Sequence, residues 1–354
     1  MSKILIKNGK IWDGERFYFA DVLTDNEKIS KIADKIEEAA EFEYDASGKI
    51  VSAGLVDAHV HMRGINKDFG IHAELSSIPF GVTAAADACG AYGDKNLLDS
   101  FLVKNVIFVP VEIRNNKAFF NSVESGVEKY GEKAIGIKIY FDTQISEVND
   151  ILPLRETVEY AEKCGLIVMV HSSNPPVGMA ELLSSLRKGD ILTHAYHGGA
   201  NNVSEKNYEC IFDAKKRGVI IDAGLAGHIH TDFDILKSGI ACGAGPDTIS
   251  TDITRFSAYK RGGRYGMTMC MSIARYLGMN EEDIFRAVTS VPAKALGKEK
   301  EWGCLEVGRC ADIAVFDYKE EGFNLTDNAG NHIDSGLGYR CVLTIADGEV
   351  VYKD

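Results

Sequence analysis

The sequence predicts an α/β protein built as a (β/α)₈ (TIM) barrel, with a small β domain assembled from both ends of the chain. Short runs rich in Val and Ile end in polar residues and alternate with helix-like stretches. The run ends recur about every 28 residues, which is the size of one strand-plus-helix unit. Eight such ends follow in succession, at His59, Asp87, Glu112, Lys138, His171, His194, Asp222 and Asp252. Eight units favour a barrel over an open doubly wound sheet, because no GxGxxG fingerprint follows the first strand.

The stretches between these runs have the signals of helices that cover a barrel. Helices are expected at Leu152–Cys164, Met179–Lys188 and Glu205–Arg217, and each is followed directly by a glycine. Glycine just past the last turn adopts the left-handed conformation at little cost, and basic residues near that end suit the helix dipole. The runs that come next, such as Leu166–Val170, are almost wholly apolar, as buried parallel strands are.

The two ends of the chain have a different pattern, in which strand-like segments are separated by turn signals. Asn8-Gly9 and Asp13-Gly14 mark turns near the start, and Asp347-Gly348 predicts a hairpin between two late strands. Neither end has enough apolar surface to form a core alone. We therefore expect a composite β-sandwich-like domain of residues 1–50 and 304–354, beside a barrel of residues 51–303.

Composition and charge exclude several classes of partner. The chain has 354 residues and a formal net charge of −13, so it offers no basic stripe for nucleic acid. Its apolar runs are far shorter than the roughly 18 residues that cross a membrane. Eight cysteines without a CxxC pair and an N-terminus without a signal-peptide core predict a cytoplasmic location. We expect a small-molecule partner, with homo-oligomer formation left open.

Two histidines close the first barrel strand. His59 and His61 are two residues apart, so both imidazoles leave the same face of the strand at its carboxyl end. Neutral imidazoles are ligands for divalent metals such as zinc. An HxH pair alone is weak evidence, since paired histidines are often only hydrogen-bonded. The case strengthens because His171, His194 and Asp252 end three other strand units and should meet on the same rim.

Lys138 ends the fourth strand unit among apolar residues. A lysine at such a place ordinarily extends its ammonium to water or pairs with an acid. Beside a metal ion, however, a protonated lysine would be repelled.

Taken together, these motifs resemble the amidohydrolase superfamily, in its binuclear-metal branch with dihydroorotases, dihydropyrimidinases and N-acyl amino acid deacetylases. Within that branch the chain is most similar to the dihydroorotase-like and amidohydrolase/deacetylase group. The resemblance extends over essentially the whole chain. The matching segments are residues 54–61, 136–138, 193–194, 247–252, 292–297 and 303–317, together with His171.

The resemblance implies a role for each of these polar residues. His59 and His61 would bind one metal, His171 and His194 a second, and carboxylated Lys138 would bridge the two. Asp252 would ligate the first metal and act as the catalytic general base and then general acid, beside a metal-bridging hydroxide. The implied cofactors are two divalent metal ions, with zinc expected, and a carboxyl group derived from CO₂.

Other residues on the same rim are less determined by the sequence. Arg114, Tyr140, His228 and Arg255 are candidate substrate contacts, and His230 lies beside His228 on the same rim after the seventh strand. An arginine would suit a substrate that carries a carboxylate. For each of them, the alternative is an ordinary polar residue of a surface loop. Cys89 stands where some relatives have a metal-binding cysteine, and its thiolate is an alternative bridge to Lys138.

The resemblance implies an amidohydrolase that acts on carbon–nitrogen bonds other than peptide bonds. Its substrate would be a cyclic amide or an N-acyl, for instance N-acetyl, compound, with esters as further candidates. One alternative is a deaminase of the same superfamily, which usually needs one metal and no bridging lysine. Another is a non-catalytic dihydropyrimidinase-like scaffold. Such scaffolds lose ligands, whereas all six ligand positions are filled here.

Overall fold

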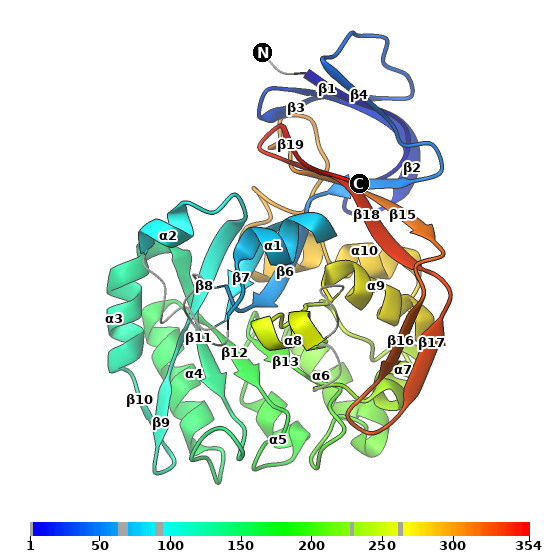
Figure 1. The fold of residues 1–354 in the computed structure, drawn as a ribbon. Coiled ribbons are helices and arrows are strands. Elements are labelled where there is room, and N and C mark those ends of the chain that lie inside the picture. The colour runs from blue at the N-terminus through cyan, green and yellow to red at the C-terminus, as the bar shows by residue number, and fades with distance from the viewer. Residues whose placement is uncertain (1–2, 63–69, 89–94, 227–229, 261–264) are drawn as a thin grey trace.

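The computed structural model describes residues 3–62, 70–88, 95–226, 230–260 and 265–354 (Figure 1). It contains two large sheets, one parallel and one formed by the two ends of the chain. Figure 1 shows the second sheet projecting from one side of the helix-covered body, with both termini on it. Cys89 and His228 lie outside the described residues.

The larger body is organised around a curled sheet of seven parallel strands. Its spatial order is β14-β13-β12-β11-β8-β7-β6, so neighbours along the chain are neighbours in space. Strand interiors are almost entirely buried, which explains their continuous apolar sequences. The strands are β6 (Leu55–Val60), β7 (Val82–Asp87), β8 (Lys104–Pro110), β11 (Ala134–Tyr140), β12 (Ile167–His171), β13 (Ile191–Thr193) and β14 (Ile220–Ile221).

The expected eighth strand is not a regular strand. Residues 248–253 instead make one parallel bridge to each side, between Asp222 and Thr248 and between Val60 and Ile253. Backbone hydrogen bonds join this segment to both edges of the sheet, for example from Asp252 N to His59 O at 2.8 Å. The segment departs from a strand because Asp252 has a positive φ of 45°, which ends the extended conformation.

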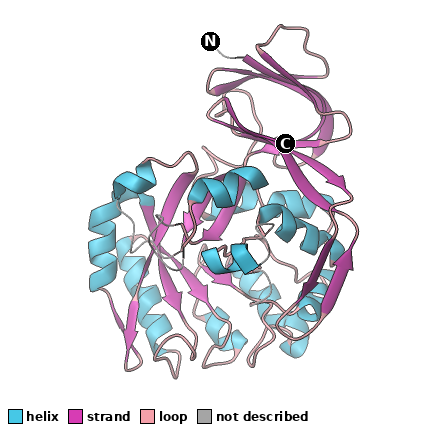
Figure 2. Cartoon of the chain, in the orientation of Figure 1, coloured by secondary structure: helices cyan, strands magenta, loops and turns pink. Residues whose placement is uncertain are grey.

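Helices cover the outside of the parallel sheet, as Figure 2 shows. The prediction for Leu152–Cys164 is confirmed in full by α4, which is followed by Gly165 in the left-handed conformation. The other two predicted helices are shorter in the structure. The helices are α1 (Ala73–Ser77), α2 (Lys95–Asp99), α3 (Asn121–Tyr130), α4 (Leu152–Cys164), α5 (Met179–Ser184), α6 (Glu209–Arg217), α7 (Phe233–Ala241), α8 (Arg255–Lys260), α9 (Met267–Tyr276), α10 (Glu281–Ala287) and α11 (Ser290–Ala295). Short 3₁₀ turns are η1 (Ile78–Phe80), η2 (Gly131–Lys133) and η3 (Glu205–Tyr208).

The second sheet joins strands from the two ends of the chain. Strand β5 pairs with both β1 and β15, and this pairing connects the first residues to the last. Asp347-Gly348 forms the predicted hairpin turn between β18 and β19. Asn8-Gly9 instead lies at a β-bulge inside β1, so the prediction of a turn there is wrong. The strands are β1 (Lys3–Trp12), β2 (Phe17–Asp25), β3 (Lys28–Ala33), β4 (Phe42–Asp45), β5 (Ile50–Ala53), β15 (Ile313–Lys319), β18 (Gly338–Ala346) and β19 (Glu349–Lys353). Two small hairpins are β9 (Glu112–Arg114) with β10 (Lys117–Phe119), and β16 (Phe323–Thr326) with β17 (His332–Ser335).

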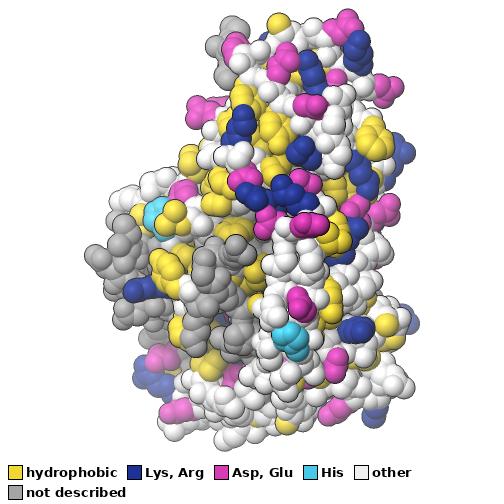
Figure 3. Space-filling model, turned by 45° about the vertical axis from the view of Figure 1, so that its right-hand side comes forward, with side chains coloured by type: hydrophobic (Ala, Val, Ile, Leu, Met, Phe, Trp, Pro, Cys, Tyr) yellow, Lys and Arg dark blue, Asp and Glu magenta, His cyan; other side chains and the backbone are white. Residues whose placement is uncertain are grey.

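Acidic and basic side chains are intermingled on the face drawn in Figure 3, where neither sign forms a continuous stripe. Within the described parts of the chain, no helix combines the length and apolarity needed to cross a bilayer.

Candidate metal centre

The carboxyl ends of the parallel strands bring six predicted side chains into one buried cluster. His59 belongs to β6, Lys138 to β11 and His171 to β12, while His194 directly follows β13. Parallel strands direct their carboxyl ends to the same rim, so residues far apart in sequence meet there. The exposed fraction of each side chain is below one tenth. The members of this cluster are His59, His61, Lys138, His171, His194 and Asp252.

Asp252 lies between three of the imidazoles. Its Oδ1 is 2.9 Å from Nε2 of His61 and 3.3 Å from Nε2 of His59. Its Oδ2 is 3.7 Å from Nε2 of His194. Lys138 Nζ lies 3.1 Å from the same Nε2 of His59. One carboxylate, three imidazoles and one lysine nitrogen therefore share a small buried volume.

A buried relay holds the ring of His59. The hydroxyl of Thr193 donates to Asp222 Oδ2 at 2.8 Å, so its oxygen can accept a hydrogen bond from His59 Nδ1 at 3.0 Å. This arrangement puts the proton of His59 on Nδ1 and leaves the lone pair of Nε2 directed toward the cluster. Asp222 also accepts the hydroxyl hydrogens of Thr248 and Ser250, which anchors the segment that carries Asp252.

In His194 and His171, too, the ring nitrogen that points away from the cluster is held by a hydrogen bond. His194 Nδ1 donates to the carbonyl oxygen of Gly224 at 2.6 Å, so Nε2 carries the lone pair. His171 Nε2 donates to Asp142 Oδ2 at 3.3 Å, which leaves Nδ1 as its coordinating nitrogen. Carbonyl and carboxylate partners of this kind orient metal-binding histidines and increase their basicity.

Two of the cluster residues have a strained backbone. His194 has a φ of 62° and Asp252 a φ of 45°, in the left-handed region that side chains other than glycine adopt at a cost. Asp57 stabilises the second of these conformations, because its carboxylate accepts from both the hydroxyl and the backbone N–H of Thr251. Strain of this kind is typical of functional positions.

The protonation states also suit a metal. Burial lowers the pKa of His59 and of His194 well below the usual value for imidazole, and it lowers the pKa of His171 as well. Burial alone would raise the pKa of Asp252, but the neighbouring imidazoles of His59 and His61 hold it well below its usual range. At neutral pH the imidazoles of His59, His171 and His194 are therefore neutral, and Asp252 is ionised.

The donor set fits divalent cations. His194 Nε2 has no hydrogen-bond partner among the described residues, and its lone pair faces the ionised carboxylate of Asp252. The lone pair of His59 Nε2 faces the same carboxylate. Buried acceptors that face one another repel, and a cation between them would turn this repulsion into attraction. Nitrogen and carboxylate ligands suit zinc and similar metals.

Two further residues adjoin the cluster: Asp142, which the sequence did not predict, and His230, which it placed on this rim without a role as a metal ligand. Asp142 accepts from His171 and also from the backbone and side-chain N–H groups of Asn174. His230 places its ring centroid 4.3 Å from that of His194. Asp142 lies four residues after Lys138, a position without a distinguishing pattern. His230 follows the seventh strand in a loop whose path the sequence does not determine.

The candidate substrate contacts are distributed unevenly. Tyr140 is half-buried, and its ring centroid is 5.6 Å from that of His171. Arg255 is exposed at the start of α8. Arg114 lies on the exposed β9–β10 hairpin, where it pairs with Glu112, and it does not join the cluster. The structure thus brings Tyr140 close to a predicted ligand and places Arg114 away from the cluster.

We expect Asp142→Asn to weaken metal binding at His171 by about 10- to 100-fold, the usual effect of losing a carboxylate that orients a metal-binding histidine. The pKa of Asp142 is lowered to about 2 despite burial, because His171 and the nearby N–H groups stabilise its anion. Metal dissociation constants measured by chelator competition would check this. Asp150→Asn is the matched control, because its exposed carboxylate contacts the backbone N–H of Leu152 and the side chain of Asn116 and no histidine of the cluster. Equal affinities in the two variants would contradict the role of Asp142.

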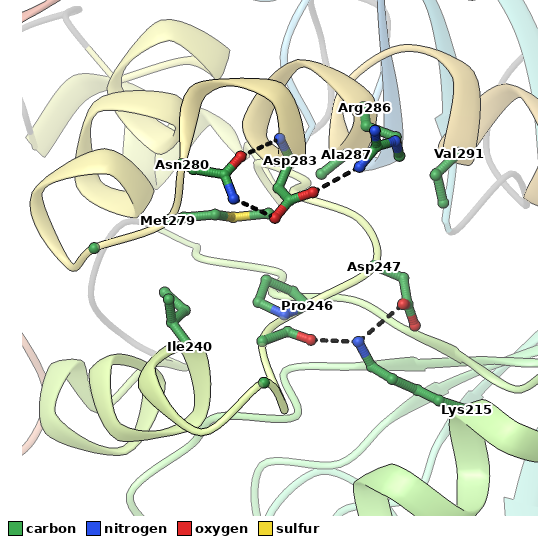
Figure 4. Close-up of a pocket in the computed structure, with 13 residues that line it drawn as sticks. Lys215, Ile240, Pro246, Asp247, Met279, Asn280, Asp283, Arg286, Ala287 and Val291 are labelled. Atoms are coloured by element: carbon green, nitrogen blue, oxygen red, sulfur yellow. Dashed lines mark hydrogen bonds and ion pairs between the residues drawn. The ribbon is translucent and has the colours of Figure 1, made fainter. Parts of the chain in front are cut away.

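A separate pocket of about 340 Å³ lies at the opposite ends of the strands (Figure 4). Its charged groups are already paired: Lys215 contacts Asp247 at 2.9 Å, and Arg286 contacts Asp283 at 2.6 Å. Asn280 donates to the same Asp283. At the amino-terminal face of a barrel such pairs serve stability. We therefore assign the reactive site to the histidine cluster.

Sequence comparison connects the chain with hydrolases. The profile of the amidohydrolase family matches residues 223–352. A deacetylase of Enterococcus faecalis is 27% identical, and the alignment covers 98% of each chain. A dihydroorotase of Lactobacillus acidophilus is 25% identical, with 99% of each chain covered.

Solved structures show the same fold. An adenine deaminase superposes with a TM-score of 0.87 at 24% identity, over the whole of both chains. A dihydroorotase gives 0.86 at 22% identity, again over both whole chains. A D-hydantoinase (dihydropyrimidinase) from Thermus sp. gives 0.70 at 18% identity, over 99% of this chain and 95% of the other. At these identities, the similarity establishes the fold of the chain and not its activity.

Proposed function

We propose that the chain is a metal-dependent hydrolase of the amidohydrolase superfamily, which acts on carbon–nitrogen bonds other than peptide bonds and cleaves a small cyclic amide or N-acyl compound at the histidine cluster. The observation that carries this proposal is the convergence of four buried imidazoles, Lys138 and Asp252 on one strand-end rim.

The proposed centre holds two divalent ions, with zinc as the expected metal. His59, His61 and Asp252 would hold one ion, His171 and His194 the other, and Lys138 carboxylated at Nζ would contact both. When bound, the metals would polarise the scissile carbonyl and lower the pKa of a water. The buried position of Lys138 beside His59 supports this assignment, because an ammonium there would be repelled by a cation.

Asp252 is the proposed proton carrier. Its low pKa keeps it ionised, so it can accept a proton from the attacking water. It would then donate that proton to the leaving nitrogen, which departs as a neutral amine or amide. The hydrogen bond from Thr251 to Asp57 fixes the neighbouring residue and so limits the movement of Asp252.

Tyr140 is the proposed substrate contact that the structure supports best, since its ring borders His171. Arg255 is a candidate partner for a substrate carboxylate, from the start of α8. We further propose that residues 248–253 complete an eight-stranded barrel spanning residues 51–303. Residues 1–50 and 304–354 would form the separate sandwich-like domain.

The function is tested by a hydrolysis screen on protein loaded with zinc and on protein stripped by a chelator. We expect the loaded protein to hydrolyse at least one N-acetyl amino acid, cyclic imide or dihydropyrimidine. Activity should disappear on stripping and return when zinc is added. Release of ammonia from an aminated ring, with no amide hydrolysed, would indicate a deaminase. Turnover unaffected by metal removal would contradict the proposal.

A further inference from the structure

His230 lies at the same rim as the predicted ligands, although it belongs to none of the motifs. Its ring centroid is 4.3 Å from that of His194 and 4.9 Å from that of His171. His171, His194 and His230 each have one ring nitrogen that lies within 4.8 Å of a ring nitrogen of the other two. A single ion with metal–nitrogen distances of about 2.1 Å needs donors this close together.

The outer nitrogen of His230 is held as those of the other ligands are. His230 Nδ1 is 2.7 Å from the hydroxyl oxygen of Ser173. His59 is held by Thr193, His171 by Asp142 and His194 by Gly224 in the corresponding way. With Nδ1 donating to Ser173, Nε2 of His230 becomes the nitrogen that can coordinate. Ser173 is only two residues beyond His171, so the same strand end supplies both the ligand and this hydroxyl.

His197 provides an instructive contrast. It is equally a histidine near the carboxyl ends of the strands, and its side chain is buried. Its Nδ1, however, accepts a hydrogen bond from the backbone N–H of Gly199 at 3.1 Å. The proton of the neutral ring must therefore be on Nε2, so neither nitrogen offers a lone pair to a metal. Proximity alone thus does not make a ligand here, and the hydrogen-bond pattern separates His230 from His197.

We propose that His230 is a third imidazole ligand of the second metal, which would then be held by His171, His194 and His230. The inference rests on the proposed function, because it concerns one of the two metals of that centre. Three imidazoles suffice for a divalent ion with an open position. The second ion should therefore stay bound even when Lys138 cannot be carboxylated.

The test is metal affinity, measured by competition between the full-length protein and a chromophoric zinc chelator. We expect two zinc ions in the unaltered protein and a second ion bound at least 10- to 100-fold more weakly in His230→Ala, since losing even an orienting partner costs that much. His197→Ala is the matched control and should bind both ions normally. Ser173→Ala should give a smaller loss of the second ion. Circular dichroism would establish that each variant is folded.

A second pair of variants tests the same inference independently. Lys138→Ala should keep the second zinc ion, so after dialysis it should hold one zinc ion more than Lys138→Ala combined with His230→Ala. Wild-type zinc affinity in His230→Ala, with or without a change in KM, would overturn the inference and leave the proposed function intact. If His230→Ala does not fold, a folded Lys138→Ala protein that holds no zinc would overturn it. An unaltered protein that binds no zinc would overturn the proposed function itself.

Discussion

Replacing Asp252 by asparagine is expected to lower kcat by at least about 100-fold, the usual contribution of a general acid–base residue. The amide cannot accept a proton from water, and it is a weaker ligand than the carboxylate that lies 2.9 Å from His61. The backbone should tolerate the change, because asparagine adopts the left-handed conformation required by the φ of 45° more readily than most residues. Steady-state kinetics with a hydrolysed substrate would measure the loss.

Metal content separates the two roles of Asp252. If Asp252→Asn keeps both ions but loses turnover, the role of Asp252 is proton transfer. Asp247→Asn is a suitable control, because Asp247 pairs with Lys215 at the opposite face and lies outside the cluster. Near-normal turnover of Asp252→Asn with full metal content would remove Asp252 from the mechanism.

Replacing Lys138 by alanine is expected to abolish nearly all turnover. Its side chain is fully buried, with Nζ 3.1 Å from His59. In the proposed centre a neutral Nζ adds to CO₂, forming a nitrogen–carbon bond and releasing one proton. Alanine removes that anion, and the second ion should then depend on imidazoles alone. Kinetics and zinc content measured on the same preparation would show both effects.

Chemical rescue distinguishes a missing anion from a collapsed core. Formate or acetate should partly restore turnover to Lys138→Ala by placing a carboxylate in the vacated space. Lys138→Arg keeps a cation but cannot be carboxylated, so it should stay inactive with or without these acids. Turnover of Lys138→Arg close to that of the unaltered protein would contradict carboxylation.

The sequence predicts the parallel strands well because burial on both faces requires continuous apolar runs. It predicts α4 to the residue because Gly165 provides a clear helix end. The start of α6 differs because Lys206, Asn207 and Tyr208 all have positive φ, so the first turn of the predicted helix is replaced by a left-handed one. α5 also ends at Ser184 rather than Lys188. Such local departures depend on tertiary contacts that no single-sequence pattern records.

The candidate site could be predicted where it follows from strand register. His59, His171 and His194 come at the ends of apolar runs, so their meeting follows from parallel topology. Asp142 and His230 lie in the loops beyond those ends. A loop path is set by hydrogen bonds such as that between Ser173 and His230, and their partners are distant in sequence.

In the proposed centre, this rim holds two metal ions with a carboxylated lysine between them. The most direct measurement is a crystal structure of zinc-loaded protein, with anomalous diffraction data collected at the zinc absorption edge. We expect two anomalous peaks among the rings of His59, His61, His171 and His194, and density for a carboxyl group on Nζ of Lys138. A single peak at full occupancy, or two peaks beside an unmodified Lys138 in active protein, would contradict it.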